Sequence, residues 1–424
     1  MSDSAPLDVF DRRESEVRGY IRAFPTVFDR AHGSTLVDAD GHEYLDFFAG
    51  AGVLNYGHNN PVLTRALIEY LERGGILHGL DMATSAKKAF IEAFGRLVLE
   101  PRGLDHKLQF TGPTGANAVE AALKVARQAT GRSNVVAFTN GFHGLSLGAL
   151  AATGNSHYRA AAGVGLDDIA RLPFDGYLGA DVDTLDLLEK MLDDPGSGLD
   201  LPAAVIVEAV QGEGGINVAS VPWLQRLREL TAARGILLIL DEIQAGVGRT
   251  GAFFAFEAAG IVPDIVTVSK SISGSGLPMS LVLLRPEVDV WKPGQHTGTF
   301  RGNNLAFVSA RVALEAYWAD TALTDGVAAK SELLRGELEQ IAAEYPDLGF
   351  VVRGRGLMYG LACDRDRGLA GRISKAAFAR GLVIETSGAF DEVLKFLPAL
   401  TITDDELRRG LGIVRESLAA AVAG

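Results

Sequence analysis

Five short runs of branched apolar residues and alanine recur through the middle of the chain, with helical patterns between them. Each run is almost wholly apolar, whereas a strand with one face in water would alternate apolar and polar residues. Strands covered on both faces and separated by helices form mainly parallel sheets. The sequence therefore predicts an α/β large domain, with strands at residues 135–138, 203–210, 236–240, 265–268 and 281–284.

The two ends of the chain carry different patterns. Residues 35–48 hold Asp40-Gly41 between two half-apolar stretches, which is the usual signal for a β-hairpin. The pattern is helical over 305–344, and a final helix is expected after Thr403, because Thr403 and Glu406 have the spacing of a capping box. Strand-like stretches lie between these helices, at 349–352 and 357–362.

These patterns divide the 424 residues into three parts. A chain of this length commonly folds as about two or three domains, with room for a cleft between them. We expect the two end parts to pack together as one small α+β domain beside the large one. The expected parts are an N-terminal lobe over 1–58, the large domain over 59–304 and a C-terminal small domain over 305–424.

Acidic residues outnumber basic ones, 53 to 40, which gives a formal charge of −13. Nucleic-acid grooves and sites for anionic membranes need clustered Lys and Arg, so this balance favours a small-molecule partner. The single Cys363 cannot form an internal disulfide, and no stretch has the apolar length of a membrane span or a signal peptide. We expect a cytoplasmic protein with no nucleic-acid, membrane or metal site.

Ser269-Lys270 directly follows the predicted strand at 265–268. Folds of the α/β class bind ligands at the carboxyl ends of strands, and a partly desolvated lysine there is suited to forming a Schiff base. A solvated lysine at the start of a loop is the alternative, and the residue alone does not distinguish the two.

The predicted strand at 236–240 ends abruptly in Asp241-Glu242. An acid at the buried end of a strand is costly without a cationic partner, and a protonated pyridine nitrogen is such a partner. A carboxylate in that place keeps the ring protonated, which maintains the electron sink that carbanion chemistry needs. The alternative is a structural acid that caps the following turn.

Two loops could hold a flat, phosphorylated group. Residues 111–117 form a glycine-containing turn before a predicted helix at 118–129, and the N–H groups of a helix start suit a phosphate. Such turns also simply begin helices. Phe142 follows the strand at 135–138 and could stack on a heterocycle, or it could be a core residue beside a hydrogen-bonded His143.

The order and company of these segments resemble one family, the class III aminotransferases, which are pyridoxal 5'-phosphate (PLP) enzymes of fold type I. The likeness spans nearly the whole chain, with the motifs in the family's order. The resembling segments are Thr114-Gly115-Ala116, Phe142-His143-Gly144, residues 208–215, residues 241–251, Ser269-Lys270 and residues 296–300.

The resemblance implies PLP as the cofactor and a homodimer or larger homo-oligomer, because the family builds its sites across a subunit interface. It also implies Lys270 and Asp241 as catalytic residues. Lys270 would hold the cofactor and move protons, and Asp241 would pair with the pyridine nitrogen. The other implied cofactor residues are Gly115 and Ala116 at the phosphate, Phe142 on the ring, Glu208 nearby, Gln244 near the phenolic oxygen and Thr299 at the neighbouring subunit's phosphate.

Two positions depart from the family's usual pattern. Glu213 matches an acid that commonly pairs with a C-terminal arginine, but Lys395 stands where that arginine is expected. Leu145 stands where many members that bind dicarboxylates have an arginine, and a lysine lacks the bidentate fork of arginine. We hypothesise that some of Arg22, Arg301 and Lys395 bind the substrate carboxylates, with Tyr20 as a hydrogen-bond donor. Ion pairs at a subunit interface are the alternative for the two arginines.

Within the family, five longer strings look most like those of the L-2,4-diaminobutyrate transaminases that feed ectoine synthesis. That likeness implies amino transfer from L-glutamate to L-aspartate 4-semialdehyde, giving L-2,4-diaminobutyrate and 2-oxoglutarate. Another ω-aminotransferase or an aminomutase acting on a different terminal amine stays open. A nucleotide-binding protein, suggested by Gly50-Ala51-Gly52, would lack the third glycine of the fingerprint and leave Lys270 unexplained. The strings lie at 20–28, 46–61, 74–82, 276–280 and 291–304.

Overall fold

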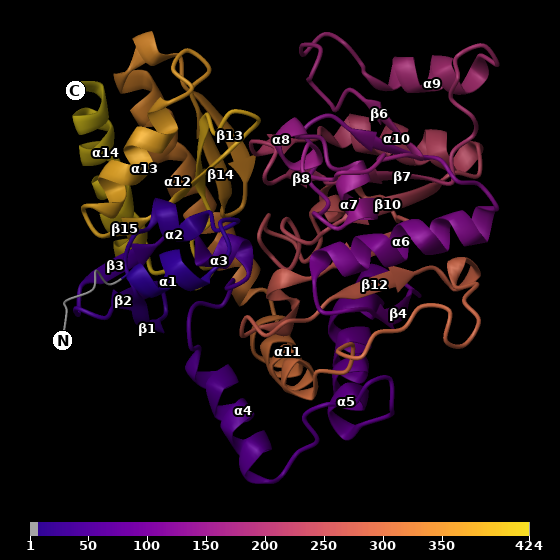
Figure 1. Cartoon of the computed structure of the whole chain (residues 1–424), viewed down its shortest axis with the longest axis horizontal. Coiled ribbons are helices and arrows are strands. Elements are labelled where there is room, and N and C mark those ends of the chain that lie inside the picture. Colours follow the sequence, from indigo (N-terminus) through magenta and orange to yellow (C-terminus); the bar gives the residue numbers. More distant parts are fainter. Residues whose placement is uncertain (1–6, 424) are drawn as a thin grey trace.

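The computed structural model describes residues 7–423, and Figure 1 shows two lobes side by side. The larger lobe is built on a seven-stranded sheet, and the smaller lobe gathers the two ends of the chain. Within residues 7–423, none of the helices combines the length and the apolar character that a membrane span requires.

The central sheet of the larger lobe is mainly parallel, as predicted. β12 runs antiparallel to both of its neighbours, whereas the five strands on one side of it are parallel to one another. The strands lie in the order β4 (Lys107–Phe110), β12 (Leu281–Leu284), β11 (Ile265–Val268), β10 (Leu237–Asp241), β7 (Ala204–Val207), β5 (Val135–Phe138) and β6 (Ile169–Leu172).

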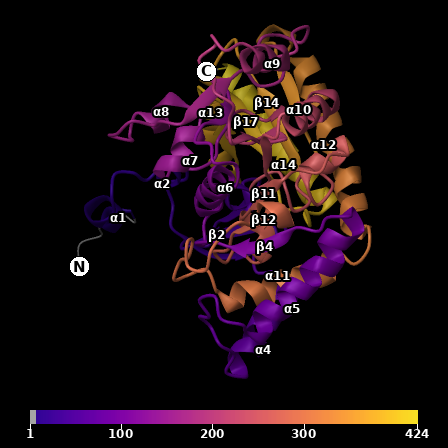
Figure 2. The ribbon, with the colours of Figure 1, turned by 90° about the vertical axis from the view of Figure 1, so that its right-hand side faces the viewer.

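Alternate residues of these strands belong to two separate apolar layers. In β5, Val135 and Ala137 share a layer with α6 (Gly115–Thr130), which lies beside β11 and β12 in Figure 2. Phe138 belongs to the other layer, where its ring centroid lies 5.0 Å from that of Trp223 in α10 (Val221–Ala233). Both faces of the sheet are therefore covered, which explains why its strands are apolar throughout.

Three helices form a bundle below the sheet in Figure 1: α4 (Pro61–Glu72), α5 (Ser85–Phe94) and α11 (Asn304–Tyr317). α11 packs against both α4 and α5. The Asn60 side chain caps α4 by accepting the N–H groups of Val62 and Leu63. Pro61 stands in the first turn, where the backbone N–H that proline lacks would have no acceptor within the helix.

The helical pattern over 305–344 corresponds to two helices rather than one continuous helix. α11 ends at Tyr317, and α12 spans Ala322–Glu344. The Asp320 side chain accepts the N–H of Ala322 at 3.0 Å, so one of the free N–H groups in the first turn of α12 has a partner. α12 packs against strands of the smaller lobe, whereas α11 packs in the bundle. The three-part division of the chain stays a prediction, and this packing favours a second boundary between Tyr317 and Ala322.

The smaller lobe joins both ends of the chain in one sheet. β2 (Thr35–Asp38) and β3 (Glu43–Asp46) form the predicted hairpin, and β15 (Leu382–Val383) pairs parallel with β3, as expected if the two end parts pack together. The predicted capping box is present, because Thr403 Oγ1 accepts the N–H of Glu406 at 3.2 Å and Glu406 Oε2 accepts the N–H of Thr403 at 2.9 Å.

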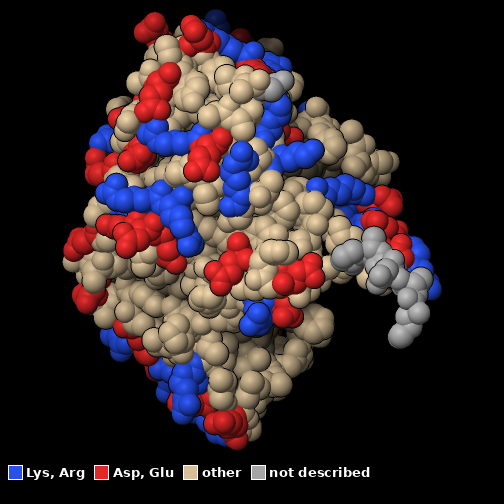
Figure 3. Space-filling view, turned by 90° about the vertical axis from the view of Figure 1, so that its left-hand side faces the viewer, with Lys and Arg blue, Asp and Glu red and all other residues tan. Residues whose placement is uncertain are grey.

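A second sheet of the smaller lobe has the order β13 (Val351–Arg355), β14 (Met358–Ala362), β17 (Val393–Phe396) and β16 (Glu385–Ser387). α12 and α13 (Leu369–Phe378) pack against it, and α14 (Asp404–Ala423) packs against both of these helices. Figure 3 shows Lys and Arg interspersed with Asp and Glu over this side of the molecule, so opposite charges partly cancel there.

Short elements complete the described chain. They are α1 (Asp8–Arg13), α2 (Tyr20–Ala23), β1 (Phe28–His32), α3 (Ala49–Gly52), η1 (Gly95–Leu99), η2 (Glu100–Arg102), α7 (Leu147–Ala152), α8 (Ser156–Arg159), α9 (Leu185–Asp193), β8 (Val210–Gln211), β9 (Asn217–Val218), η3 (Ala255–Ala259), η4 (Lys270–Ser273), η5 (Pro286–Val288) and η6 (Pro346–Leu348).

Candidate active site

Lys270 lies directly beyond the carboxyl end of β11, where it begins η4. Its backbone φ is 53°, a left-handed value that residues other than glycine adopt rarely and often at functional sites. Its Nζ donates to the carbonyl oxygen of Ala51 at 2.9 Å. Burial lowers the pKa of the Lys270 amine, although the Glu213 carboxylate opposes the shift. A lowered pKa increases the neutral, nucleophilic fraction of the amine.

Asp241 ends β10, the strand next to β11, and is buried. Its Oδ1 accepts the hydroxyl of Thr267 at 3.0 Å and the N–H of Ile243 at 3.1 Å. Its Oδ2 accepts Nδ1–H of His143 at 2.7 Å. Burial alone would lower the pKa of His143, but the hydrogen bond to Asp241 raises it. Three donors from three segments therefore fix the orientation of this carboxylate.

Phe142 follows β5, and its ring lines the cavity that also contains Lys270. Its N–H donates to Oε2 of Glu208 at 2.9 Å, and Oε1 of Glu208 accepts the N–H of Gly212 at 3.2 Å. Burial raises the pKa of Glu208 to about 7, against the opposing effect of His143. Glu208 thus positions the backbone of two loops, and it is not among the described residues that line the cavity.

The start of α6 fits a phosphate group. Thr114 Oγ1 accepts the N–H of Asn117 at 3.3 Å, which fixes the first turn, and the helix begins at Gly115. The first N–H groups of a helix, which here include those of Gly115 and Ala116, have no acceptor within the helix and carry its positive dipole end. Gly115 has no side chain, and Ala116 adds only a methyl group.

Gln244 provides a second test of whether PLP fits. Its Nε2 donates to the Ala51 carbonyl and to Oε1 of Glu213, both at 3.0 Å, whereas its Oε1 is buried without a hydrogen-bond partner. A buried orphaned acceptor requires a donor, and a cofactor hydroxyl supplies one. The amine of Lys270, the acid of Asp241 and this amide therefore form a donor and acceptor set that fits PLP.

Lys395 lies in β17 with 0% of its surface exposed. Its Nζ lies 2.7 Å from Oε1 of Glu213 and 3.0 Å from Oε1 of Glu385. Although burial alone would raise the pKa of Glu213, the ammonium groups of Lys395 and Lys270 lower it to about 2. Burial raises the pKa of Glu385 to about 7, and the opposing effect of Lys395 does not reverse this shift. Lys395 is thus shared between two acids.

A cavity of about 1070 Å³ lies between the two lobes and reaches Lys270. The larger lobe contributes Phe142 and Glu213 to its lining, and the smaller lobe contributes Tyr20 and Glu385. The Tyr20 hydroxyl donates to Oε2 of Glu385 at 3.3 Å. The cavity therefore joins Phe142 and Lys270 to a cluster of acids from both lobes.

Of the predicted site residues, Tyr20, Phe142, Glu213 and Lys270 line this cavity, and Arg22, Arg301 and Thr299 are among those that lie outside its described lining. Arg22 pairs with Glu16 at 2.6 Å, and Arg301 pairs with Asp81 at 2.9 Å. Thr299 is exposed on the segment that leads into α11. Because each arginine already has an acid within the chain, binding of substrate carboxylates by Arg22 or Arg301 stays a prediction.

Glu385 and Tyr158 are site residues that the sequence reasoning missed. Glu385 follows the apolar residues 382–384, and an acid that ends an apolar run is the same signal that indicated Asp241. Tyr158 lies in α8, and its ring meets that of Phe142 edge-on, with centroids 5.5 Å apart. No comparable signal marks Tyr158 in the sequence.

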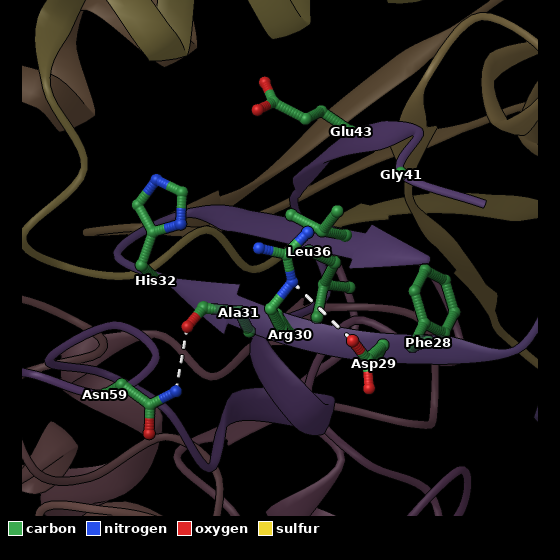
Figure 4. A pocket seen from close by; sticks show the side chains of 10 residues that line it. Phe28, Asp29, Arg30, Ala31, His32, Leu36, Gly41, Glu43 and Asn59 are labelled. Atoms are coloured by element: carbon green, nitrogen blue, oxygen red, sulfur yellow. Dashed lines mark hydrogen bonds and ion pairs between the residues drawn. The ribbon is translucent and has the colours of Figure 1, made fainter. Parts of the chain in front are cut away.

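A second depression, of about 660 Å³, lies over the strands β1 to β3 (Figure 4). Asp29 and Arg30 form an ion pair at 3.6 Å there, and Asn59 donates to the Ala31 carbonyl at 2.8 Å. Figure 4 shows Arg30 and Glu43 standing apart rather than converging on one point. The residues that line this depression include none of the predicted site residues.

Comparisons with known proteins identify the family and the fold. The family model described as Aminotransferase class-III matches residues 18–418. A diaminobutyrate--2-oxoglutarate transaminase of Bordetella parapertussis is 62% identical, over 98% of this chain and 96% of the relative. A Vibrio cholerae protein of the same name is 58% identical, over 97% of this chain and 100% of the relative. The solved ornithine aminotransferase of Toxoplasma gondii matches with a TM-score of 0.84 at 29% identity, over 98% of this chain and 94% of that one.

Proposed function

This chain belongs to the class-III aminotransferase family, and from that membership we propose that it transfers the amino group of L-glutamate to L-aspartate 4-semialdehyde. The products are L-2,4-diaminobutyrate and 2-oxoglutarate. The fold is the α/β fold type I of PLP enzymes. The observation that carries the proposed substrates is the near-full-length identity to transaminases named for diaminobutyrate and 2-oxoglutarate.

PLP is the cofactor, and when bound it supplies an electron sink and the group that carries the amine between substrates. Lys270 would hold the cofactor through its Nζ, and the same amine would move a proton at the reacting carbon. Asp241, oriented by His143, would pair with the ring nitrogen. Phe142 would pack on the ring, and the start of α6 would bind the phosphate.

The lining of the cavity suits a reaction with two different substrates. Glutamate presents a carboxylate next to its reacting carbon, whereas the reacting carbon of the semialdehyde is terminal. Glutamate needs a cation that binds the carboxylate next to its reacting carbon. When the semialdehyde reacts, no carboxylate lies at that point, so the cation needs an acid of the protein as its partner. Lys395 with Glu213 at 2.7 Å supplies such a pair, because the carboxylate can leave the ammonium when a substrate carboxylate replaces it.

The proposal extends to assembly, location and product use. We place the enzyme in the cytoplasm as a homodimer or larger homo-oligomer, with Thr299 reaching the cofactor phosphate of a neighbouring subunit. The exposure of Thr299 leaves it free for such a contact, and the single buried Cys363 suits a reducing compartment. The diaminobutyrate formed would serve as an ectoine precursor.

A donor and acceptor screen of the purified protein tests the proposed reaction. We expect diaminobutyrate to form from L-glutamate and L-aspartate 4-semialdehyde, and the reverse reaction to consume diaminobutyrate with 2-oxoglutarate. L-Ornithine and 4-aminobutyrate serve as competing terminal amines. Faster turnover of either competitor would contradict the assignment and favour another ω-aminotransferase activity.

A further inference from the structure

Glu385 belongs to the buried cluster around Lys395, but the family resemblance assigns it no role. Its Oε1 lies 3.0 Å from Nζ of Lys395, and its Oε2 accepts the Tyr20 hydroxyl at 3.3 Å. It is 5% exposed, and the small part that solvent reaches lies on the cavity wall. Glu385 is therefore anchored by the Tyr20 hydroxyl and by an ion pair with Lys395, while its Oε1 is buried without a hydrogen-bond partner.

The cavity wall near Lys270 presents carboxylates rather than cations. Glu213, Glu385 and Asp391 all line it, whereas Lys395 lies behind the first two and is not among the described lining residues. Among the residues that the structure describes, no arginine lines this cavity. A substrate that enters meets a negative surface first.

The charges of the cluster do not balance. Lys270 serves the cofactor, which leaves the single ammonium of Lys395 to neutralise the carboxylates of Glu213 and Glu385. Glu213 holds the shorter contact with Lys395 and a second donor from Gln244, so Glu385 is the acid left in surplus. A buried carboxylate without a full counter-charge is costly, and either a proton or a cationic ligand removes that cost.

We propose that Glu385 is a specificity-determining residue that binds the free 2-ammonium group of diaminobutyrate while the 4-amino group reacts at Lys270. The inference rests on the proposed function and names the group that distinguishes this substrate from a simple terminal amine. Many substrates carry carboxylates like those of glutamate and the semialdehyde, so a carboxylate does not distinguish diaminobutyrate from them. The 2-amino group of diaminobutyrate does, because 4-aminobutyrate has no such group.

The test compares diaminobutyrate with 4-aminobutyrate, which differs from it only by lacking the 2-amino group. Selectivity is the ratio of kcat/KM for the two amines, with 2-oxoglutarate as the acceptor. Calorimetric binding of both amines to holo Lys270→Ala protein provides a readout without turnover. The variants are Glu385→Gln, Glu385→Asp, which keeps the charge, and Asp391→Asn, which removes another acid from the same cavity wall.

We expect Glu385→Gln to lower the selectivity at least about 10-fold, entirely through diaminobutyrate, because a site built for a charged group discriminates through that group. The same loss should appear in the binding ratio, while Glu385→Asp and Asp391→Asn keep most of the selectivity. An unchanged ratio in Glu385→Gln, or an equal loss for both amines, would overturn the inference. Wild-type protein that does not use diaminobutyrate would instead overturn the proposed function.

Discussion

Nδ1 of His143 donates to Oδ2 of Asp241 at 2.7 Å, and both side chains are buried. The histidine follows β5 and the aspartate ends β10, so the bond joins two segments at the carboxyl edge of the sheet. His143 is a positioning residue, because it reaches the cofactor site only through Asp241. The pair gives a structural reason for a histidine after Phe142, and it is a hydrogen-bonded histidine as the sequence analysis considered.

Asp241→Asn should reduce turnover by about 2 to 3 orders of magnitude, since the neutral amide cannot sustain the charge at the ring nitrogen. The fold should persist, because an amide oxygen can still accept from Thr267 and Ile243. Steady-state kinetics and thermal unfolding of the holoenzyme check both statements. Asp193→Asn, at the exposed C-terminal end of α9, is the control. Turnover near the wild-type rate would show that Asp241 is only structural.

Lys395→Met should destabilise the protein by about 3 to 5 kcal/mol, because it leaves two buried carboxylates without their shared cation. Chemical denaturation measures the change in the free energy of unfolding. Lys375→Met replaces an exposed lysine of α13 and should change it by less than about 0.5 kcal/mol. Equal stability of the two variants would mean that the cluster around Lys395 is not ionised.

The preference for diaminobutyrate over 4-aminobutyrate should strengthen as pH rises from about 6 to about 8. Burial raises the pKa of Glu385 to about 7 despite Lys395, so its carboxyl is neutral below this pH and charged above it. A charged carboxylate binds the ammonium more tightly. We use the ratio of the affinities for diaminobutyrate and 4-aminobutyrate, because a protein group whose titration changes both affinities equally leaves this ratio unchanged.

Other groups around Glu385 also titrate or carry charge. They are Tyr20 of α2, Tyr158 of α8, Glu213 of the β8–β9 turn, Lys270 of η4, Asp391 of the loop before β17 and Lys395 of β17, while α13 contributes the uncharged Ser374. Glu385→Gln keeps all of them and should abolish the pH dependence of the ratio. A persistent dependence in that variant would assign the titration to one of these neighbours.

Gly212→Ala should weaken cofactor binding by about 10-fold without unfolding the protein, since loss of a well-made polar contact costs about 1 to 3 kcal/mol. A Cβ at Gly212 would overlap Oε1 of Gln244 and displace that amide. Absorbance after dialysis measures how much cofactor is retained. Gly371→Ala, in α13 with open space around it, is the control. Full retention in Gly212→Ala would argue against a cofactor contact by Gln244.

The sequence predicts the inner strands of the central sheet because both faces of that sheet are covered, but it misses the two edge strands β4 and β6, whose residues include Lys107, Gln109 and Arg171. The predicted strands at 135–138, 265–268 and 281–284 coincide with β5, β11 and β12. The antiparallel direction of β12 could not be predicted, because an apolar run looks the same in either direction. The break between α11 and α12 was missed, since Trp318 and its neighbours contain no glycine or proline.

The nearness of Lys270 and Asp241 is likewise predictable, because both stand at the carboxyl ends of adjacent strands, which meet at one edge of the sheet. The substrate side is not. Glu385 meets Lys395 only through the register of the neighbouring strands β16 and β17, and it meets Tyr20 only through a contact between distant segments. Arg301 illustrates the opposite problem, because its pairing with Asp81 depends on two loops that meet only in the folded chain.

The central claim is that Lys270 holds the cofactor, and borohydride reduction of the holoenzyme followed by peptide mapping tests it most directly. Reduction fixes the link between cofactor and protein, so mass spectrometry can locate it. The geometry predicts that the label lies on Lys270 and disappears in Lys270→Ala, which should also lose transamination while retaining some cofactor through its phosphate contacts. A label on Lys395 or on any other lysine would contradict the assignment.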